Sequence, residues 1–214
     1  MNALTLPSFV GYFLTNTLSL LGTWVQKVGL GWLAWQITES TFWTSVVSLL
    51  LMAPVGLLGP FIAVFAERWN SRYAMLATKI MMLGISGVIF VIQLLGLHNL
   101  FTLVACSTAL GLLSAFHHPI RLVYISLVVP KPYLASAVGL NSVSWNLSRI
   151  IGPGLAGLTI HLMGLSETFF IAILLYAPLI VSLYFLVLQP RTGDTAEPTS
   201  FLKQMLDGGT VALR

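Results

Sequence analysis

Long apolar runs alternate with short polar breaks along the chain. The hydrocarbon core of a bilayer is about 30 Å thick and needs about 20 apolar residues per helix. Pro119 is expected to end the fourth run and to open a cytoplasmic loop that contains Arg121. The pattern predicts an all-α membrane protein with six transmembrane helices, at residues 9–36, 42–65, 73–96, 99–120, 134–161 and 168–189.

The character of the chain changes after Gln189. The segment PRTGDTAEPTS is polar and contains two prolines, which is typical of a linker, and SFLKQMLDGG has the spacing of a short amphipathic helix. We therefore expect two parts. Residues 1–189 form the six-helix transmembrane domain, and residues 190–214 form a cytoplasmic linker that leads toward a second half.

Composition supports a membrane location and excludes several other classes. Hydrophobic residues make up 57% of the 214 residues and charged residues only 7%, whereas soluble domains carry about 25% charged residues. The net charge of +4 is scattered and does not indicate nucleic-acid binding. Cys106 is the only cysteine, and the motifs HExxH, GxSxG and GxxxxGK[ST] are missing from the sequence. We therefore predict no metal, no cofactor and no enzyme activity.

Lysine and arginine residues near the predicted helix ends set the orientation. Basic residues favour the cytoplasmic side of a membrane protein, and with a cytoplasmic N-terminus the outer loops receive none of them. Both termini are then cytoplasmic. The cations expected on that side are Arg68, Arg72, Lys79, Arg121, Lys131, Arg191, Lys203 and Arg214.

Lys27 and Arg149 lie inside predicted helices instead. A charge at the membrane centre costs at least about 2.5 kcal/mol, so we expect each to face a cavity or a partner. An absent half could supply acids, the cavity could hold an anionic or oxygen-rich substrate, or both side chains could reach the outer interface. The substrate-path candidates are these cations and the polar or aromatic residues near them at helical spacing: Asn16, Thr23, Lys27, Asn141, Trp145 and Arg149.

His117 and His118 are adjacent, so on a helix their side chains point about 100° apart and make a poor metal pair. We place both at the cytoplasmic end of the fourth helix. Trp24, Trp32 and Trp145 fall inside helices, where they could stack on an aromatic ligand or pack against lipid and protein.

Two similar segments suggest an internal repeat. LLGPFIA at residues 57–63 and IIGPGLA at residues 150–156 lie in helices predicted to cross the membrane in opposite directions. This is the relation expected of two inverted three-helix repeats, although glycine–proline pairs are also frequent in unrelated membrane helices. The residues proposed to bend or pack these helices are Gly59, Pro60, Gly152, Pro153 and Gly157.

The segment FAERWNSRY resembles the loop between the second and third helices of the major facilitator superfamily. In that comparison Glu67 stands for an aspartate and Arg68 and Arg72 match basic positions, while Ala63, Asn70 and Tyr73 depart from the pattern. The segments SLLGTWVQKVGLGWLAWQIT, GPFIAVFAERWNSR, HHPIRLVYISLVVPKPYLASAVGLNSVSWN and SRIIGPGLAG are similar to an enterobactin-exporter-like branch of bacterial efflux proteins. The resemblance covers about residues 9–188.

The resemblance implies the N-terminal half of a secondary active transporter in a bacterial inner membrane. Such a protein exports a small molecule, siderophore-like or drug-like, by alternating access. Its partners would be the lipid bilayer, the substrate, protons as a candidate coupling ion, and an absent C-terminal six-helix half or a second copy. The predicted helices contain no acidic residue as an obvious proton carrier.

The resemblance also gives Glu67, Arg68 and Arg72 a role as a conformational-switch loop that latches the two halves. The alternative is that both arginines only anchor helix ends at the cytoplasmic face. For the whole chain, the alternative is a truncated membrane protein that does not transport and acts as a scaffold or interaction partner.

Overall fold

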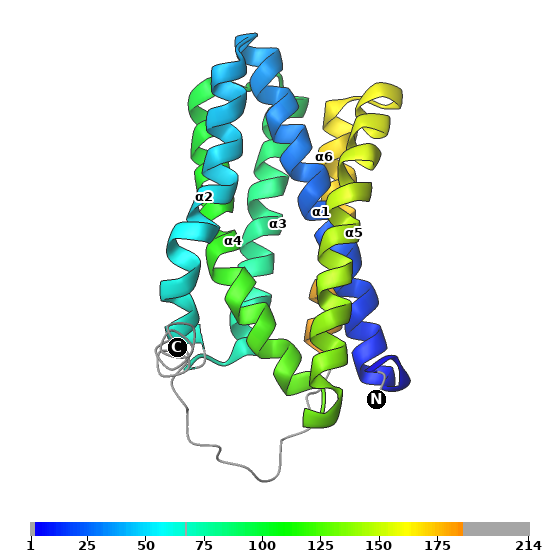
Figure 1. Ribbon diagram of the computed structural model, residues 1–214. Coiled ribbons are helices and arrows are strands. Elements are labelled where there is room, and N and C mark those ends of the chain that lie inside the picture. The colour runs from blue at the N-terminus through cyan, green and yellow to red at the C-terminus, as the bar shows by residue number, and fades with distance from the viewer. Residues whose placement is uncertain (1–2, 67, 186–214) are drawn as a thin grey trace, which may run out of the picture.

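The computed structural model describes residues 3–66 and 68–185, and all regular elements in these residues are helices (Figure 1). Glu67 and the predicted linker at 190–214 lie outside the described residues. Two short 3-10 helices, η1 (Ala3–Thr5) and η2 (Lys131–Tyr133), precede α1 and α5. The long helices are α1 (Pro7–Thr38), α2 (Thr41–Ala66), α3 (Ser71–Leu94), α4 (Leu100–Val128), α5 (Leu134–Leu162) and α6 (Leu165–Phe185).

Local sequence signals explain several of the helix ends. The Asn70 side chain accepts a hydrogen bond from the backbone N–H of Tyr73 and caps α3. Asn99 and Thr102 form a reciprocal capping box at the start of α4. Between α5 and α6, Gly164 has a φ of 113°, a conformation that glycine adopts without the steric cost of a side chain. These signals keep the connections short.

Pro119 lies inside α4, so the prediction that it ends the fourth helix is wrong. The helix continues to Val128, and Arg121 lies within it rather than in a loop. Proline removes one backbone donor, but neighbouring helices and local adjustment of the backbone make it tolerable inside membrane helices. The connection to α5 is therefore short, and it consists of residues 129–133.

The six long helices pack in a consistent set of pairs. The most extensive contacts join α2 to α4, α1 to α6, and α1 to α5, followed by contacts of α3 with α4 and α6. Figure 1 shows α2 on one side of the bundle with the first part of α4 behind it, and α5 on the other side with the first part of α1 beside it, while α1 and α4 run obliquely between these sides. The bundle therefore has two sides, which α3 and α6 connect through their contacts.

Two apolar clusters stabilise the bundle toward its opposite ends. One contains Phe9 of α1, Ile125 of α4 and Leu183 of α6. The other contains Leu33 of α1 and Leu103 of α4, which lie at the other ends of the same helices. Between these clusters each of the three helices carries polar residues, and this middle layer is where the site lies.

Four helices, α2, α3, α4 and α6, are long and apolar enough to cross a membrane. The two remaining long helices, α1 and α5, have sufficient length but include more polar residues. Those of α1 include Asn16, Gln26 and Lys27, and those of α5 include Asn141 and Arg149. The more polar helices pack against each other, so part of their polar surface is shared.

The predicted packing glycines have different surroundings. A Cβ atom on Gly152 would overlap the Cβ atom of Trp24, so this glycine lets α5 approach α1 closely. A Cβ atom on Gly59 or Gly157 would meet nothing within 4 Å. The helices continue through Pro60 and Pro153, which lie inside α2 and α5.

Candidate functional site

A pocket lies between the helices and contains most of the basic side chains in the middle of the bundle. Its enclosed cavity volume is about 30 Å³, and the empty space including its open mouth is about 390 Å³. Five of the long helices contribute to its wall. We call it the basic pocket. It is lined by Leu20, Thr23, Lys27, Val55, Lys79, Met82, Ser114, His117, His118, Arg121 and Trp145.

Among the described residues the three cations of the basic pocket have no acidic partner; Lys79 and Arg121 are buried, and Lys27 is half-buried. The Lys79 side chain is 2% exposed and the Arg121 side chain 1% exposed. The pocket wall contains no aspartate or glutamate. Among described residues the acids are Glu39, which follows α1, and Glu167, in the first turn of α6. Glu39 is 12 positions from Lys27, about 18 Å along a helix, which is too far for an ion pair.

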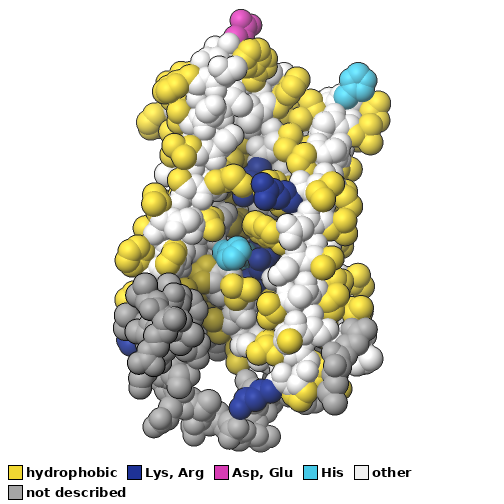
Figure 2. Space-filling view, in the orientation of Figure 1, with side chains coloured by type: hydrophobic (Ala, Val, Ile, Leu, Met, Phe, Trp, Pro, Cys, Tyr) yellow, Lys and Arg dark blue, Asp and Glu magenta, His cyan; other side chains and the backbone are white. Residues whose placement is uncertain are grey.

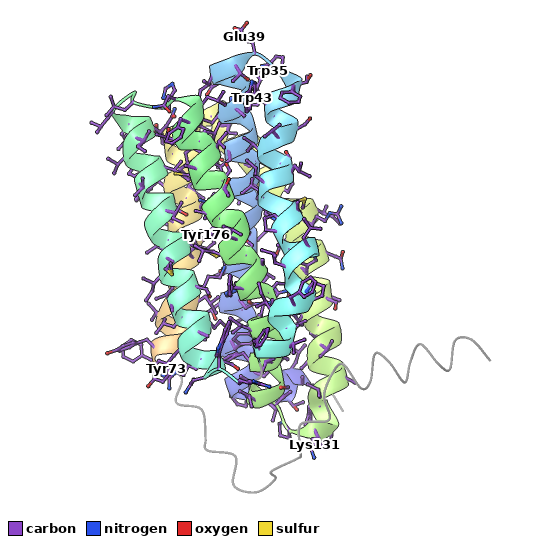
Figure 3. The ribbon with its side chains drawn as sticks, turned by 90° about the vertical axis from the view of Figure 1, so that its left-hand side faces the viewer. Trp35, Glu39, Trp43, Tyr73, Lys131 and Tyr176 are labelled. Carbon is purple, nitrogen blue, oxygen red and sulfur yellow. The ribbon has the colours of Figure 1, made fainter. Side chains whose placement is uncertain are left out.

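Figure 2 shows this distribution on one face of the molecule. Lysine, arginine and histidine side chains gather midway along the bundle, in a hollow between its two sides, while an acidic side chain lies at one end. In Figure 3, Glu39 is at that end together with Trp35 and Trp43, and Tyr73 and Lys131 lie at the opposite end. The positive charge of the pocket is therefore interior and not part of either end.

Trp24 supports two cations through its indole ring. Lys27 Nζ lies 4.8 Å from the ring centroid, and Arg149 Cζ lies 5.9 Å from it. The ring itself contacts Trp145 edge to face, with a centroid separation of 5.9 Å. An aromatic face attracts a cation through its quadrupole, and the contribution is about 0.5–2 kcal/mol.

Trp145 supports the other side of the pocket in the same way. Arg121 Cζ lies 5.1 Å from its ring centroid, and the His118 ring meets it edge to face at 5.4 Å. Arg121 Nε has no hydrogen-bond partner among the described residues. The aromatic contact therefore offsets only part of the cost of burying this guanidinium group.

Lys79 lies against a buried hydrogen-bond network. Its Nζ atom is 4.8 Å from the ring centroid of Tyr176, which Figure 3 shows near the middle of the bundle. The Tyr176 hydroxyl donates to Gln26 Oε1 at 2.6 Å, and Gln26 Nε2 donates to Ser86 Oγ at 2.7 Å. This chain of bonds joins α6, α1 and α3 and fixes the ring on which the ammonium group lies.

His117 is oriented by α3. Its Nδ1 atom lies 2.9 Å from the hydroxyl oxygen of Thr78, within hydrogen-bond distance. Its Nε2 atom is buried and has no partner among the described residues. One side of the ring is thus fixed by the protein, and the other side is available to a molecule in the pocket.

The structure separates the predicted substrate-path residues into three groups. Thr23, Lys27 and Trp145 line the basic pocket, while Arg149 is exposed and contacts the ring of Trp24, which is not one of the lining residues. The remaining two, Asn16 and Asn141, are buried and meet each other across α1 and α5, with Asn16 Nδ2 donating to Asn141 Oδ1 at 3.5 Å.

The sequence model of a family described as transmembrane secretion effector matches residues 2–208. The chain belongs to this family. The family lies within the major facilitator superfamily, and the relatives that the chain matches are transporters, not enzymes.

Three similar proteins illustrate the range of this transporter family. A staphyloferrin A transporter of Staphylococcus aureus is 26% identical over 182 residues, which cover 78% of the chain and 44% of the relative. The uncharacterized transporter YfiS of Bacillus subtilis is 26% identical over 73% of the chain and 37% of its own length. Macrolide efflux protein A of Streptococcus pyogenes is 22% identical over 92% of the chain and 49% of its length.

The chain spans less than half the length of these curated relatives. No solved structure matches it. The family match and the four apolar helices together identify the chain as a membrane protein of a transporter family.

Sequence reasoning missed four residues of the basic pocket: Lys79, His117, His118 and Arg121. The predictions that Arg121 lies in a loop and that the two histidines lie at a helix end are wrong, because α4 extends ten residues past His118. Lys79 lies within α3, as its predicted helix implies, but its side chain lines the pocket. A signal was present. Ser114, His117, His118 and Arg121 recur three to four positions apart, the spacing of one helix face, but the pattern is visible only if the helix continues through Pro119.

In the first turn of α3, Arg72 contacts α6. Its Nε atom donates to the Leu183 carbonyl at 2.8 Å, and its Nη2 atom donates to the Tyr184 carbonyl at 2.6 Å. Arg68 is exposed, and Glu67, the acid of the predicted switch, lies outside the described residues. Arg72 therefore joins α3 to α6 within this bundle.

Proposed function

We propose that this protein is a secondary active exporter of a small molecule, siderophore-like or drug-like, and that it works by alternating access. The observation that carries this proposal is the basic pocket, because charged groups at mid-depth of a membrane bundle mark substrate or ion pathways. The proposal places the protein in a bacterial inner membrane, with six crossings and both termini in the cytoplasm. Relatives named for staphyloferrin A and for macrolides support the two kinds of cargo.

We further propose that α1–α3 and α4–α6 are two inverted repeats. If α1 corresponds to α4, α2 to α5 and α3 to α6, the contact of α2 with α4 corresponds to that of α5 with α1. The contact of α1 with α6 likewise corresponds to that of α4 with α3. Both correspondences support the proposal, since repeats related by a two-fold axis must make equivalent contacts.

In this proposal the six helices are the N-terminal half of the transporter and act with a second six-helix half. The pocket would then face the other half, and Lys27, Thr23 and Trp145 would lie on the substrate path. Asn16, Asn141 and Arg149 would flank that path. Glu67, Arg68 and Arg72 would form the switch loop, with Arg72 bonded to α6 in the state described here. Protons remain the candidate coupling ion.

Efflux from cells tests the proposal. Cells that express the full gene should retain less of a catecholate siderophore or of a macrolide than cells without it. Lys27→Gln should reduce that export, and the matched variant Lys131→Gln, which removes a cation outside the pocket, should not. Equal retention of both compounds with and without the gene, at verified membrane levels, would contradict export of these two cargo classes.

A further inference from the structure

We propose that the basic pocket binds a small molecule with two or more negatively charged oxygen groups, carboxylate or phosphate. This inference rests on the proposed transport function, for which it names the substrate class. It concerns Lys79, Arg121, His117 and His118 as ligand-binding residues, in addition to Lys27.

The charge balance of the pocket is the first observation that supports an anionic ligand. Lys27, Lys79 and Arg121 all line one pocket, and none of them pairs with an acid among the described residues. A buried charge is costly unless it is paired and hydrogen-bonded, and a charge inside a membrane is normally paired or lines a functional cavity. Aromatic rings offset part of this cost, but they neutralise no charge. An anionic ligand would complete the balance.

The arrangement of hydrogen-bond donors is the second observation, and it supports a ligand with several anionic groups. The basic groups come from three different helices: Lys27 from α1, Lys79 from α3, and Arg121 with the two histidines from α4. Arg121 Nε and His117 Nε2 are buried atoms that have no hydrogen-bond partner among the described residues, and a ligand oxygen could satisfy them. Donors that converge from separate helices suit a molecule with several anionic groups better than a single small ion.

The same charges select against the opposite class of cargo. A cationic drug in this pocket would meet three like charges. Repulsion between like charges is strong in a low-dielectric site, and the wall contains no acidic residue that would offset it. Thr23 and Ser114 add neutral hydroxyl groups to the wall, and Trp145 adds an apolar face. The pocket therefore suits an anionic molecule with an apolar or aromatic part.

Such oxygen groups could belong to a free metabolite or to an anionic lipid headgroup. Citrate serves as the probe for a free polycarboxylate, and triethyl citrate serves as its uncharged control. Nanodiscs of phosphatidylcholine and nanodiscs that also contain phosphatidylglycerol distinguish the lipid source. Binding is measured as the shift of the thermal unfolding midpoint and by titration of tryptophan fluorescence, because Trp24 and Trp145 contact the cations.

The full chain in phosphatidylcholine nanodiscs should be stabilised by citrate and not by triethyl citrate. Arg121→Gln and Lys79→Gln should each raise the dissociation constant for citrate about tenfold, since each removes a charged hydrogen-bond donor. Lys131→Gln changes the same charge outside the pocket and should bind citrate like the parent. A higher unfolding midpoint of the empty Lys79→Gln protein would show that the variant folds.

Stabilisation by phosphatidylglycerol that Arg121→Gln loses would also support anion binding and would assign the ligand to the lipid. The proposal is overturned if neither citrate nor phosphatidylglycerol stabilises the parent, or if the pocket variants respond as the parent does. Because binding is measured without transport, that outcome leaves export itself to be judged by the efflux experiment.

Discussion

Arg72 and Arg121 are the same residue type in the same bundle, and their surroundings are opposite. Arg72 is half-buried at a helix end and donates two hydrogen bonds to the last carbonyls of α6. Arg121 is almost fully buried at mid-depth, contacts the ring of Trp145, and leaves its Nε atom without a partner among the described residues.

The difference separates stabilising cations from cations available for binding. The Arg72 guanidinium group is satisfied by two backbone carbonyl oxygens of α6, which are strong hydrogen-bond acceptors. Arg121 and Lys79 gain no comparable bonds from the described residues. Removing a cation should therefore change stability in opposite directions in the two regions.

The largest effect is expected where the aromatic support of the pocket is disrupted. Gly152→Leu would force a side chain into Trp24, separate α5 from α1 and destabilise the bundle by about 3 kcal/mol. Thermal unfolding in nanodiscs measures the loss, and tryptophan fluorescence reports the displaced ring. Gly157→Leu is the matched control, because its position is open. Equal losses in the two variants would show that the contact of α5 with Trp24 does not support the pocket.

An intermediate loss is expected at the bundle end. Arg72→Gln removes a charged donor from the carbonyls of Leu183 and Tyr184 and should lower the free energy of unfolding by about 1–2 kcal/mol. Arg68→Gln, at an exposed position in the loop before α3, should change it by less than about 0.5 kcal/mol. The measurement is the thermal unfolding midpoint of each variant compared with that of the parent. Equal midpoints would mean that Arg72 is no more than a charge near the membrane surface.

The smallest change should have the opposite sign. Lys79→Met keeps the length of the side chain, removes an unpaired buried charge and places a thioether beside Tyr176, so the empty protein should gain about 1 kcal/mol. Citrate should then stabilise the parent more than the variant. A loss of stability like that of Arg72→Gln would place Lys79 among the structural cations and end the contrast between the two regions.

Sequence patterns predict the helices of this protein well and its site only in part. The apolar runs are long and distinct, so the existence and order of six helices follow from them. The end of α4 does not follow from the apolar runs, because proline normally stops a helix in water but is tolerated where neighbouring helices pack around it. That one boundary places Arg121, expected in a loop, and the two histidines, expected at a helix end, within the bundle.

Lys79 illustrates a second limit on what the sequence can predict about the site. A lysine a few residues inside a predicted helix can reach toward the membrane surface or turn inward, and the local sequence is the same in both cases. The choice depends on the ring of Tyr176, almost a hundred positions away, and on the bonds from Gln26 that hold it. Lys27 was recognisable because it lies far from any predicted helix end.

The aromatic support of the pocket cations affects how a ligand would enter and leave. A cation held by a carboxylate must give up that partner before it can bind an anion, so entry becomes an exchange. Among the described residues no carboxylate competes for Arg121, which is held by the face of Trp145, so an incoming anion would add to the existing contact. The lining of the pocket likewise includes no carboxylate that could displace the ligand afterwards. Release must then be driven from outside the pocket, by an ion or by a rearrangement that separates the helices around it.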